Sequence, residues 1–593
     1  MKKVMSLVMA AMVMGGLVAG CGNKNEDKPN NSKDNKGTEN KGETGATDEK
    51  KDEGPITFYQ TGSKTKTLNP HLYETTAESA EMGKLYGNLL DIVVNEAGDN
   101  YEVVANHAAS LPTMSEDGLT WTFEMRDGVT WADGTPITAE TYEYSYRMQL
   151  DPVLKNYRAN VFFSSMDIVN AKAYFNGECD WEDVGIKVDG NKLILTLSYA
   201  IPEMDFQMAF VGGGARSPVK EDLYESCFNA DRTENNYGTS LETTASSGPY
   251  SLTEWIRDQN MVYTKNENYP LAHLYTPDRI EVRVSEDSNT NLTLFENGDT
   301  DYVAVPGASY EKYEEDPRIM FSQSNSVWYM FINQTSETNP ILDNLDFRNS
   351  LFYAMDRRKI AEDVYKTAYP APYYVSSFKF VKPGVSYRDT EVAKKLVPEN
   401  NGYNPELAKE HFDKAYETNG NKQIVVSMQY FDTSDSMKKM AELLEEEYEL
   451  LFGKDRIDIQ LQAVPWNSVY DNMRDGKYDL AFGGWSGGTF NPWSSMEVFT
   501  SDYASKNDKF YNEEFDKLWY DTVKGDLIFK EEERLAGLGR MEELLFENMP
   551  FVPIYQGKGA YLFSDRVTLK TGGKYLPGVG FGELQADIAQ KAQ

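Results

Sequence analysis

Histidine and cysteine are scarce in this chain. Of 593 residues, four are histidine and three are cysteine. The histidines are His71, His107, His273 and His411. They do not have the short spacing typical of metal ligands, and they suggest no catalytic triad. We therefore expect no metal site and no bound cofactor.

The sequence also gives no indication of a disulfide and little sign of hydrolase motifs. Cys179 and Cys227 could pair in an exported protein, but nothing in the sequence brings them together. We find no His-Glu-x-x-His zinc motif and expect no nucleophile elbow of the Gly-x-Ser-x-Gly kind. Acidic residues are so numerous that a glycosidase pair stays open as an alternative. The expectation is a protein that is not an enzyme.

Positive charge is also in short supply. Lys and Arg number 59 against 94 Asp and Glu, which gives a net charge of −35. Such an excess argues against nucleic-acid binding and against direct adsorption to anionic lipid. The aromatic fraction of 13% is high, and it fits either an ample core or a large cleft lined with rings.

Long apolar runs are missing except at the N-terminus. The run at residues 4–18 follows two lysines and is too short for a spanning helix. It ends in Val-Ala-Gly before Cys21, which resembles a bacterial lipobox in which Cys21 becomes the lipidated first residue. Residues 22–54 are polar and contain no aromatic residue, so we expect a disordered tether. An ordinary secretory signal is the alternative.

The most specific segment of the sequence covers residues 115–146. Leu119, Trp121, Phe123 and Met125 alternate with polar residues, which predicts a half-buried strand. After a turn at Arg126-Asp127-Gly128, Val129 and Trp131 resume the alternation, so we expect a hairpin. Thr138 is placed to cap the following helix, with Glu140 in its first turn.

The identities of the residues in this segment are more informative than their hydrophobic periodicity. The run LTWTFEMRDGVTWADGTPITAE resembles part of the extracytoplasmic solute-binding proteins of family 5, the oligopeptide-, dipeptide- and nickel-binding components of ABC importers. The run LNPHLYETTAESAEMGKLYGNLLD resembles the opening of that family. We expect its helix to carry five apolar residues on one face, Met82, Leu85, Tyr86, Leu89 and Leu90. Ser247-Gly248-Pro249-Tyr250 and the block from Val327 to Arg358 match later landmarks.

The resemblance implies an α/β protein with the two-lobed type II periplasmic-binding fold. About 540 residues follow the tether, which is more than one core usually holds. We expect the signal at 1–21, the tether at 22–54 and the solute-binding domain at 55–593. Within it we expect lobe I at 55–105, 231–325 and 556–593, an extra subdomain at 106–230, and lobe II at 326–555.

The block from Gln423 to Trp485 can be interpreted without the resemblance. Three apolar strands are predicted, at 424–428, 457–461 and 478–482, separated by amphipathic helices. Strands that alternate with helices in this way favour right-handed crossovers and a parallel sheet. Ligands of such sheets bind beyond the carboxyl ends of the strands.

Two tryptophans follow strand ends in this block, Trp466 and Trp485. Each could plug the top of the core. Both match aromatic positions of the family's peptide cleft, so the resemblance favours ligand contact.

The loop after Trp485 departs from the family pattern. Peptide binders carry the type GWxxDYxDP, whose Asp holds the peptide α-ammonium. Here Gly488 stands at that position, Thr489 follows it, and Asn491 replaces the acid before proline. The resemblance offers Glu74, on the opposite lobe, as another acid, and Tyr157 lies near a further ligand-contact position.

The expected function is therefore a monomeric, lipid-anchored substrate-binding protein on the extracytoplasmic face of the membrane. It would capture oligopeptides and deliver them to an ABC permease with its ATPase subunits. An oligosaccharide ligand is an alternative that the missing Asp favours. A nickel ligand fits less well, because the histidines do not cluster, and a secreted hydrolase is the alternative from another class.

The anchor can be tested directly. Because Cys21 is the expected lipid attachment site, Cys21→Ala should move the protein from the membrane fraction to the soluble fraction after cell fractionation. Deleting residues 22–53 while keeping Cys21 is the matched control, and it should leave ligand affinity unchanged. An alanine variant that stays in the membrane fraction would contradict the lipoprotein hypothesis.

Overall fold

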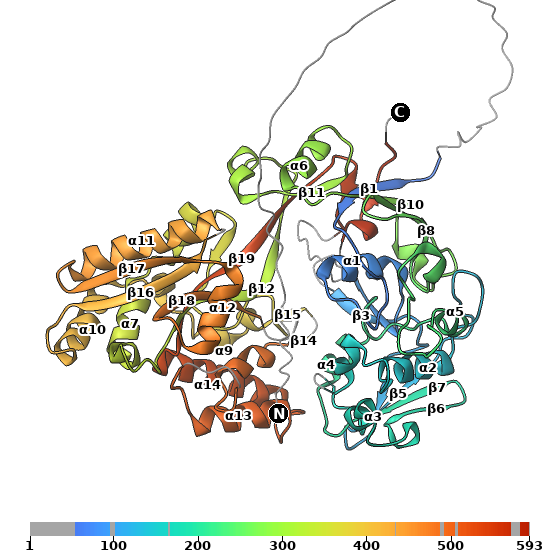
Figure 1. Ribbon diagram of the computed structural model, residues 1–593, viewed down its shortest axis with the longest axis horizontal. Coiled ribbons are helices and arrows are strands. Elements are labelled where there is room, and N and C mark those ends of the chain that lie inside the picture. Colours follow the sequence, from blue (N-terminus) through green and yellow to red (C-terminus); the bar gives the residue numbers. More distant parts are fainter. Residues whose placement is uncertain are drawn as a thin grey trace, which may run out of the picture.

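The computed structural model describes residues 54–94, 101–163, 166–382, 384–432, 434–486, 491–503, 508–570 and 582–591. Cys21, most of the predicted tether, Gly488 and Thr489 lie outside these ranges. None of the helices within them is both long and apolar enough to cross a membrane. The described chain forms two bodies, which we call lobe I and lobe II, joined by two long strands (Figure 1).

Lobe I is built on two four-stranded sheets. The first has the order β1-β10-β9-β8, with β1 parallel to β10 and the other pairs antiparallel. Its strands are β1 (Thr57–Gly62), β8 (Tyr250–Ile256), β9 (Asn260–Lys265) and β10 (Arg279–Val284). The second has the order β4-β5-β7-β6 and consists of β4 (Thr113–Met114), β5 (Thr120–Glu124), β6 (Ile186–Asp189) and β7 (Lys192–Thr196). Phe58 of the first sheet and Trp121 of the second belong to one continuous core.

Short helices and small strand pairs complete lobe I. The helices are α1 (Thr76–Leu85), α2 (Ala139–Gln149), α3 (Ala171–Asn176), α4 (Glu203–Met208), α5 (Glu221–Ser226) and α6 (Ser288–Glu296). The paired strands are β2 (Leu90–Val94) with β3 (Tyr101–Ala105), and β20 (Val567–Thr568) with β21 (Asp587–Ile588). As expected, Thr138 is the N-cap of α2, and its N–H donates to the Thr141 hydroxyl.

Two details of lobe I correct the sequence interpretation. The expected hairpin does not form, because β5 pairs with β4 and with the distant β7, while Thr130 only makes an isolated bridge to Pro136. The first helix ends at Leu85, and Leu90 already begins β2. In both places the residues are buried as predicted, but periodicity alone did not reveal their pairing partners.

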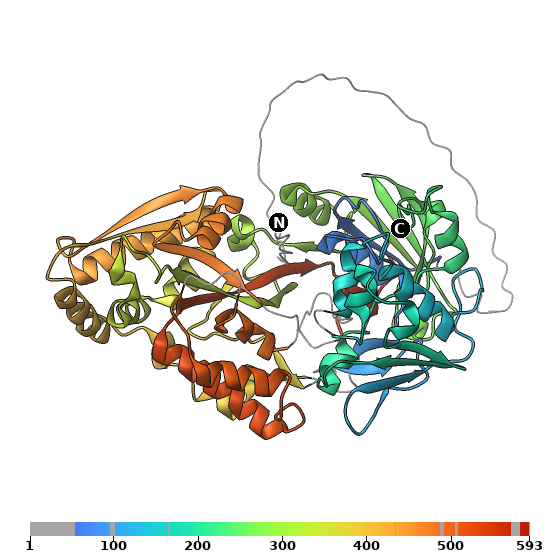
Figure 2. The same cartoon turned by 60° about the horizontal axis from the view of Figure 1, so that its bottom comes forward.

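Lobe II contains a seven-stranded mixed sheet with the order β11-β19-β12-β18-β16-β17, and β13 pairs with β19. Its strands are β11 (Tyr302–Ala304), β12 (Ile319–Ile332), β13 (Ala368–Pro370), β16 (Ile424–Phe431), β17 (Ile457–Val464), β18 (Leu480–Trp485) and β19 (Phe551–Phe563). The antiparallel strands β12 and β19 run from the end of this sheet where β11 and α6 of lobe I lie into the body of lobe II (Figures 1 and 2). They are the crossing strands between the lobes.

The predicted strand–helix block is confirmed. β16 is parallel to both β17 and β18, and α11 and α12 lie between them in sequence. The helices of lobe II are α7 (Leu345–Ala354), α8 (Arg357–Lys359), α9 (Glu391–Lys394), α10 (Pro405–Thr418), α11 (Asp435–Phe452), α12 (Trp466–Asp475), α13 (Glu513–Val523) and α14 (Glu531–Asn548). A small hairpin pairs β14 (Phe380–Lys382) with β15 (Val385–Ser386).

A buried carboxylate of α14 holds the segment that leads to this hairpin. Glu542 has no exposed surface. It accepts the Tyr374 N–H at 3.0 Å and the Tyr387 hydroxyl at 3.0 Å, and it pairs with the Arg388 guanidinium. Since the charge is both paired and hydrogen-bonded, its burial is tolerated.

We predict that Glu542→Ala destabilises lobe II by about 3–5 kcal/mol, because Arg388 would be left buried without its acid. The control is Glu543→Ala on the same helix, whose side chain is half exposed and should contribute less than about 1 kcal/mol. Scanning calorimetry of both variants measures the shift of the lobe II transition. Equal transitions would show that the buried pair does not support the fold.

Candidate functional site

The carboxyl ends of the parallel strands in lobe II form one edge of its sheet. β16, β17 and β18 end at Phe431, Val464 and Trp485. Trp485 is half-buried; its indole N–H donates to the Ser495 carbonyl at 3.0 Å, and its ring meets Tyr503 edge-on at 5.9 Å. The tryptophan therefore lies at the predicted edge, with its ring held by contacts within its own lobe.

The neighbouring predicted residues are described only in part. Trp466 begins α12 directly after Pro465, while the placement of its side chain lies outside the description. Asn491 follows the undescribed positions 487–490, and its carbonyl Oδ1 accepts the N–H groups of Trp493 and Ser494. Its amide group is thus anchored on one side by the start of the next helical turn.

Glu74 and Tyr157 belong to one region of lobe I. Both side chains are exposed, Tyr157 to 53%. Arg158 links Tyr157 to Tyr73, the residue before Glu74. Its Nε donates to the Tyr73 carbonyl at 2.7 Å, and its guanidinium lies 3.9 Å from the Tyr73 ring and 5.1 Å from the Tyr157 ring. This Arg158 bridge was not visible in the sequence.

The backbone around Glu74 is fixed by a buried acid. The Glu78 carboxylate accepts N–H groups from Lys66, Glu74 and Thr75 at 2.9–3.0 Å. Burial alone would raise the pKa of Glu78, but these backbone N–H groups outweigh it and lower the pKa below its ordinary value. The Glu74 side chain therefore projects from a rigid turn.

Lobe II also carries a row of rings that sequence reasoning did not assign to a site. Tyr365 packs on Tyr555 at 4.3 Å, Tyr555 stacks on Trp328 at 5.8 Å, and Trp328 meets Phe431 edge-on at 6.2 Å. A Cβ added to Gly484 would lie 3.1 Å from the Trp328 ring, so glycine permits this close packing. Trp328 belongs to the block from Val327 to Arg358, which the sequence marked only as a family landmark.

Lobe I reaches the loop after Trp485 through one acid on α4. Asp205 accepts a hydrogen bond from the Asn491 amide at 2.9 Å and pairs with Arg534 of α14 at 3.5 Å. The side chains of Asp205 and Arg534 are only 18% and 8% exposed. Burial raises the pKa of the Asp205 carboxyl, against the opposing pull of Arg534 and Asn491. No sequence signal marked Asp205, which lies 286 positions from Asn491.

Apolar contacts accompany this polar one. Ile92 of lobe I packs with Phe378 and Phe380 from the β14 hairpin region of lobe II, which lies beside lobe I in Figure 1. At the outer side, Phe529 of lobe II covers Gly118, where an added Cβ would approach its ring to 2.6 Å and where φ is +73°. The lobes thus meet in both polar and apolar contacts.

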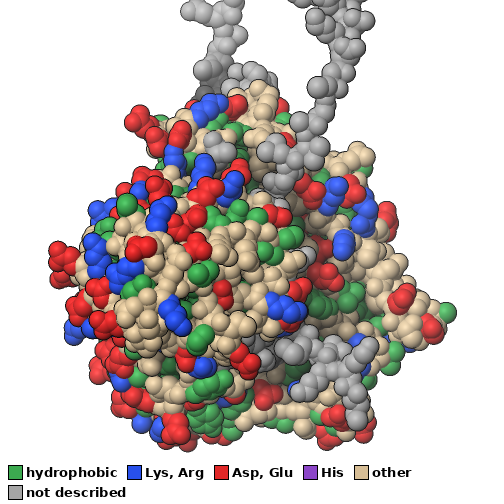
Figure 3. All heavy atoms as spheres, turned by 60° about the vertical axis from the view of Figure 1, so that its left-hand side comes forward, with side chains coloured by type: hydrophobic (Ala, Val, Ile, Leu, Met, Phe, Trp, Pro, Cys, Tyr) green, Lys and Arg blue, Asp and Glu red, His purple; other side chains and the backbone are tan. Residues whose placement is uncertain are grey.

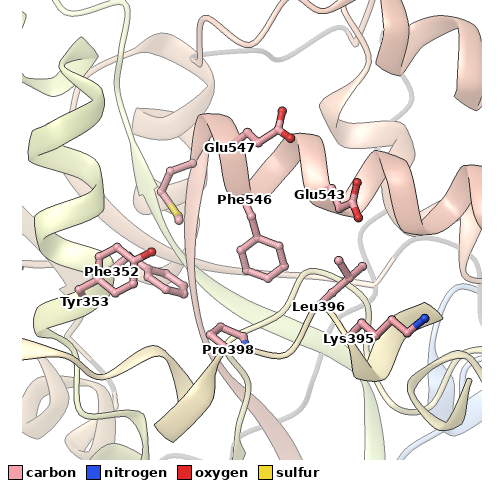
Figure 4. Close-up of a pocket in the computed structure, with 9 residues that line it drawn as sticks. Phe352, Tyr353, Lys395, Leu396, Pro398, Glu543, Phe546 and Glu547 are labelled. Atoms are coloured by element: carbon pink, nitrogen blue, oxygen red, sulfur yellow. The ribbon is translucent and has the colours of Figure 1, made fainter. Parts of the chain in front are cut away.

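An open pocket of about 320 Å³ lies elsewhere on lobe II, between α7, α14 and the segment around Pro398. Figure 4 shows Phe546 pointing from α14 into this space, with Glu543 and Glu547 on the same helix. None of its lining residues belongs to the predicted ligand contacts. On the face of lobe II shown in Figure 3, acidic and basic side chains alternate rather than gather in one patch.

The Gly-x-Ser-x-Gly motif and the histidines bear on the hydrolase alternative. The expectation of no Gly-x-Ser-x-Gly sequence was wrong, since Gly484–Gly488 has that spacing. However, His71 and His107 are buried in lobe I against Tyr224 and Tyr142, and burial lowers their pKa values to about 3 and about 4.

His411 bonds to Asp346 at 2.7 Å. Cys179 and Cys227 are free thiols. Within the described ranges, no group of acids, histidines or cysteines is arranged to hold a metal ion.

Comparisons with known proteins agree with this geometry. The family model of bacterial extracellular solute-binding proteins, family 5, matches residues 102–507. The chain is 25% identical over 557 residues to the oligopeptide-binding protein OppA of Bacillus subtilis, covering 91% of this chain and 94% of that protein.

Solved structures share the fold. The unliganded open form of the murein tripeptide binding protein MppA superposes with a TM-score of 0.72 at 21% identity, over 90% of this chain and 97% of that one. Haemophilus influenzae OppA in complex with the peptide RPPGFSPFR gives a TM-score of 0.63 at 20% identity, over 90% and 98%. The fold is therefore the type II periplasmic-binding fold predicted from the sequence. With more than half of its length matched by the family model, the chain belongs to the bacterial extracellular solute-binding proteins of family 5.

Proposed function

We propose that this protein captures peptides between its two lobes and delivers them to an ABC permease. The observation that carries the proposal is the loop after Trp485, which leaves the carboxyl edge of the parallel strands and contacts lobe I through Asn491. In α/β sheets this edge is where ligands bind. Membership of the family and its peptide-binding relatives support the choice of ligand.

The proposed contacts divide between the lobes. Trp485 and Trp466 offer ring surface from lobe II, and the loop positions Gly488, Thr489 and Asn491 lie next to them in sequence. Glu74 and Tyr157 offer an acid and a ring from lobe I. Ring stacking and burial of apolar area suit a site that accepts varied side chains. The ligand would stabilise the closed arrangement of the lobes by binding it more tightly than the open one.

We further propose that Cys21 anchors the protein to the extracytoplasmic face of the membrane, so that the tether lets the lobes reach the permease. An oligosaccharide is the second candidate ligand, since Gly488 removes the acid that would hold a peptide amine. Native mass spectrometry of the purified protein tests the ligand class, because a co-purified peptide or glycan would appear as a mass increment. Turnover of either class in an activity assay would contradict a pure binding role.

We predict that Trp485→Ala and Trp466→Ala each weaken ligand binding by about 1–3 kcal/mol, as expected when a central aromatic contact is truncated. Tyr520→Ala, an exposed aromatic residue of α13, is the control and should leave affinity within about 0.5 kcal/mol. Isothermal titration calorimetry with RPPGFSPFR measures all three. If both tryptophan variants fold and bind as the parent does, the two rings serve the core and not the ligand.

We predict that acetylating the N-terminus of RPPGFSPFR changes its Kd by less than about threefold, because residues 483–496 contain no acid and no buried charge pair would be lost. Gly488→Asp should create a preference for the free amine. Gly487→Asp, with the same charge one position earlier, is the control. If acetylation abolishes binding to the parent protein, another acid such as Glu74 holds the amine.

A further inference from the structure

The contact between Asp205 and lobe II is unusual in its composition. Asp205 comes from the six-residue helix α4, which is fixed to lobe I because Phe206 stacks on Trp121 at 4.1 Å. Its partners Asn491 and Arg534 come from two separate parts of lobe II. We call the loop after Trp485, residues 486–492, the ligand loop. The Asp205 carboxylate thus joins the ligand loop, helix α14 and lobe I at a single point.

Arg534 is itself firmly placed within lobe II. Its Nε donates to the Thr522 carbonyl at 2.8 Å, and its guanidinium lies 3.5 Å from the centre of the Trp493 ring. Neither contact neutralises its charge. Asp205 is the acid that pairs with Arg534, and burial lowers the pKa of Arg534 while Asp205 opposes that shift.

The energetics of such a pair depend on whether both partners are present. The attraction within a buried ion pair offsets the desolvation of both groups when further hydrogen bonds satisfy them. Both groups here have such bonds, to the Asn491 amide and to the Thr522 carbonyl. Removing one partner leaves the other charge buried without compensation, which is strongly unfavourable. For a pair between two lobes this cost can be relieved, because separation of the lobes returns the remaining charge to water.

We propose that Asp205, Arg534 and Asn491 form an interlobe latch that holds the lobes together beside the ligand loop and raises ligand affinity without touching the ligand. The part of this inference that concerns affinity rests on the proposed peptide-binding function. The part that concerns lobe position does not, because it rests on the direct contacts of Asp205 with Asn491 and Arg534.

The latch also explains how the loop can lack an acid of its own. The acid that reaches the loop is Asp205, and its charge is already matched by Arg534. A ligand ammonium placed there would meet a cation as well as an anion. The latch therefore acts equally on ligands with and without a free amine, whereas an Asp205 that bound the amine directly would favour the free form.

The first experiment uses the unliganded full chain. Small-angle scattering should show a larger radius of gyration for Asp205→Ala than for the parent. Glu203→Ala is the matched control, since it removes the same charge from the same helix but bonds only within it, to Gln207. Equal radii for the parent and Asp205→Ala would overturn the latch, whether or not any peptide binds.

The second experiment measures binding of RPPGFSPFR and of its N-acetyl form. Asp205→Asn keeps an oxygen for Asn491 but removes the charge, and it should raise the Kd of both peptides by the same factor, about tenfold, within the usual range of conformational coupling. A rise confined to the free amine would overturn the proposal and make Asp205 a ligand contact. Unchanged values for both would also overturn it.

A third measurement tests whether Asp205 and Arg534 act as a pair. Arg534→Met alone should open the lobes as Asp205→Ala does, while the double variant should be closer to the parent than either single variant, because no charge is left buried. Calorimetry of lobe II controls for the lost Thr522 contact. Additive effects of the two substitutions on the radius of gyration would show that Asp205 and Arg534 act independently, against the latch.

Discussion

The antiparallel pairing of β12 with β19 is the constraint to which the rest of the molecule conforms. The ladder runs from Ile319 opposite Leu562 to Phe331 opposite Phe551, so the same two strands enter both lobes. Its register shifts between Gln323 and Val327 and again between Trp328 and Tyr329, and such irregularities bend a strand and increase its local twist. The two lobes therefore keep a fixed connectivity while the bend between them lies within residues 323–329 of β12.

The bend is possible because its polar groups are satisfied. Gln556 has no exposed surface, and its amide donates to the Ser324 carbonyl at 2.7 Å and accepts from the Ser377 N–H at 3.0 Å. The Ser376 hydroxyl donates to the same Ser324 carbonyl at 2.9 Å, so this carbonyl has two donors. One side chain thus connects both crossing strands to the segment that leads to the β14 hairpin, which packs on lobe I.

Short-range patterns explain which parts of this architecture the sequence predicts. The strands and helices from Ile424 to Trp485 were found because each is regular and its neighbours in sequence are its neighbours in space. The partner of β5 was missed because β7 is contributed by a distant segment. Asp205 could not be predicted either, because an isolated acid in a short helix carries no periodic signal. The strand pattern placed the two tryptophans at the edge of the sheet, whereas their role as ligand contacts and the unusual loop were suggested by the family resemblance.

Both ends of the described chain belong to lobe I, and this has a mechanical consequence. Gln590 donates to the carbonyl of Gly54 at 2.8 Å, and Arg566 pairs with Asp301, which also accepts the Tyr59 N–H. Lobe II enters and leaves through the crossing strands alone as one uninterrupted excursion of the chain. A force applied at Gly54 would therefore act first on β1 and its neighbours in lobe I. The crossing strands lie outside the direct path between Gly54 and Gln590, which runs within lobe I.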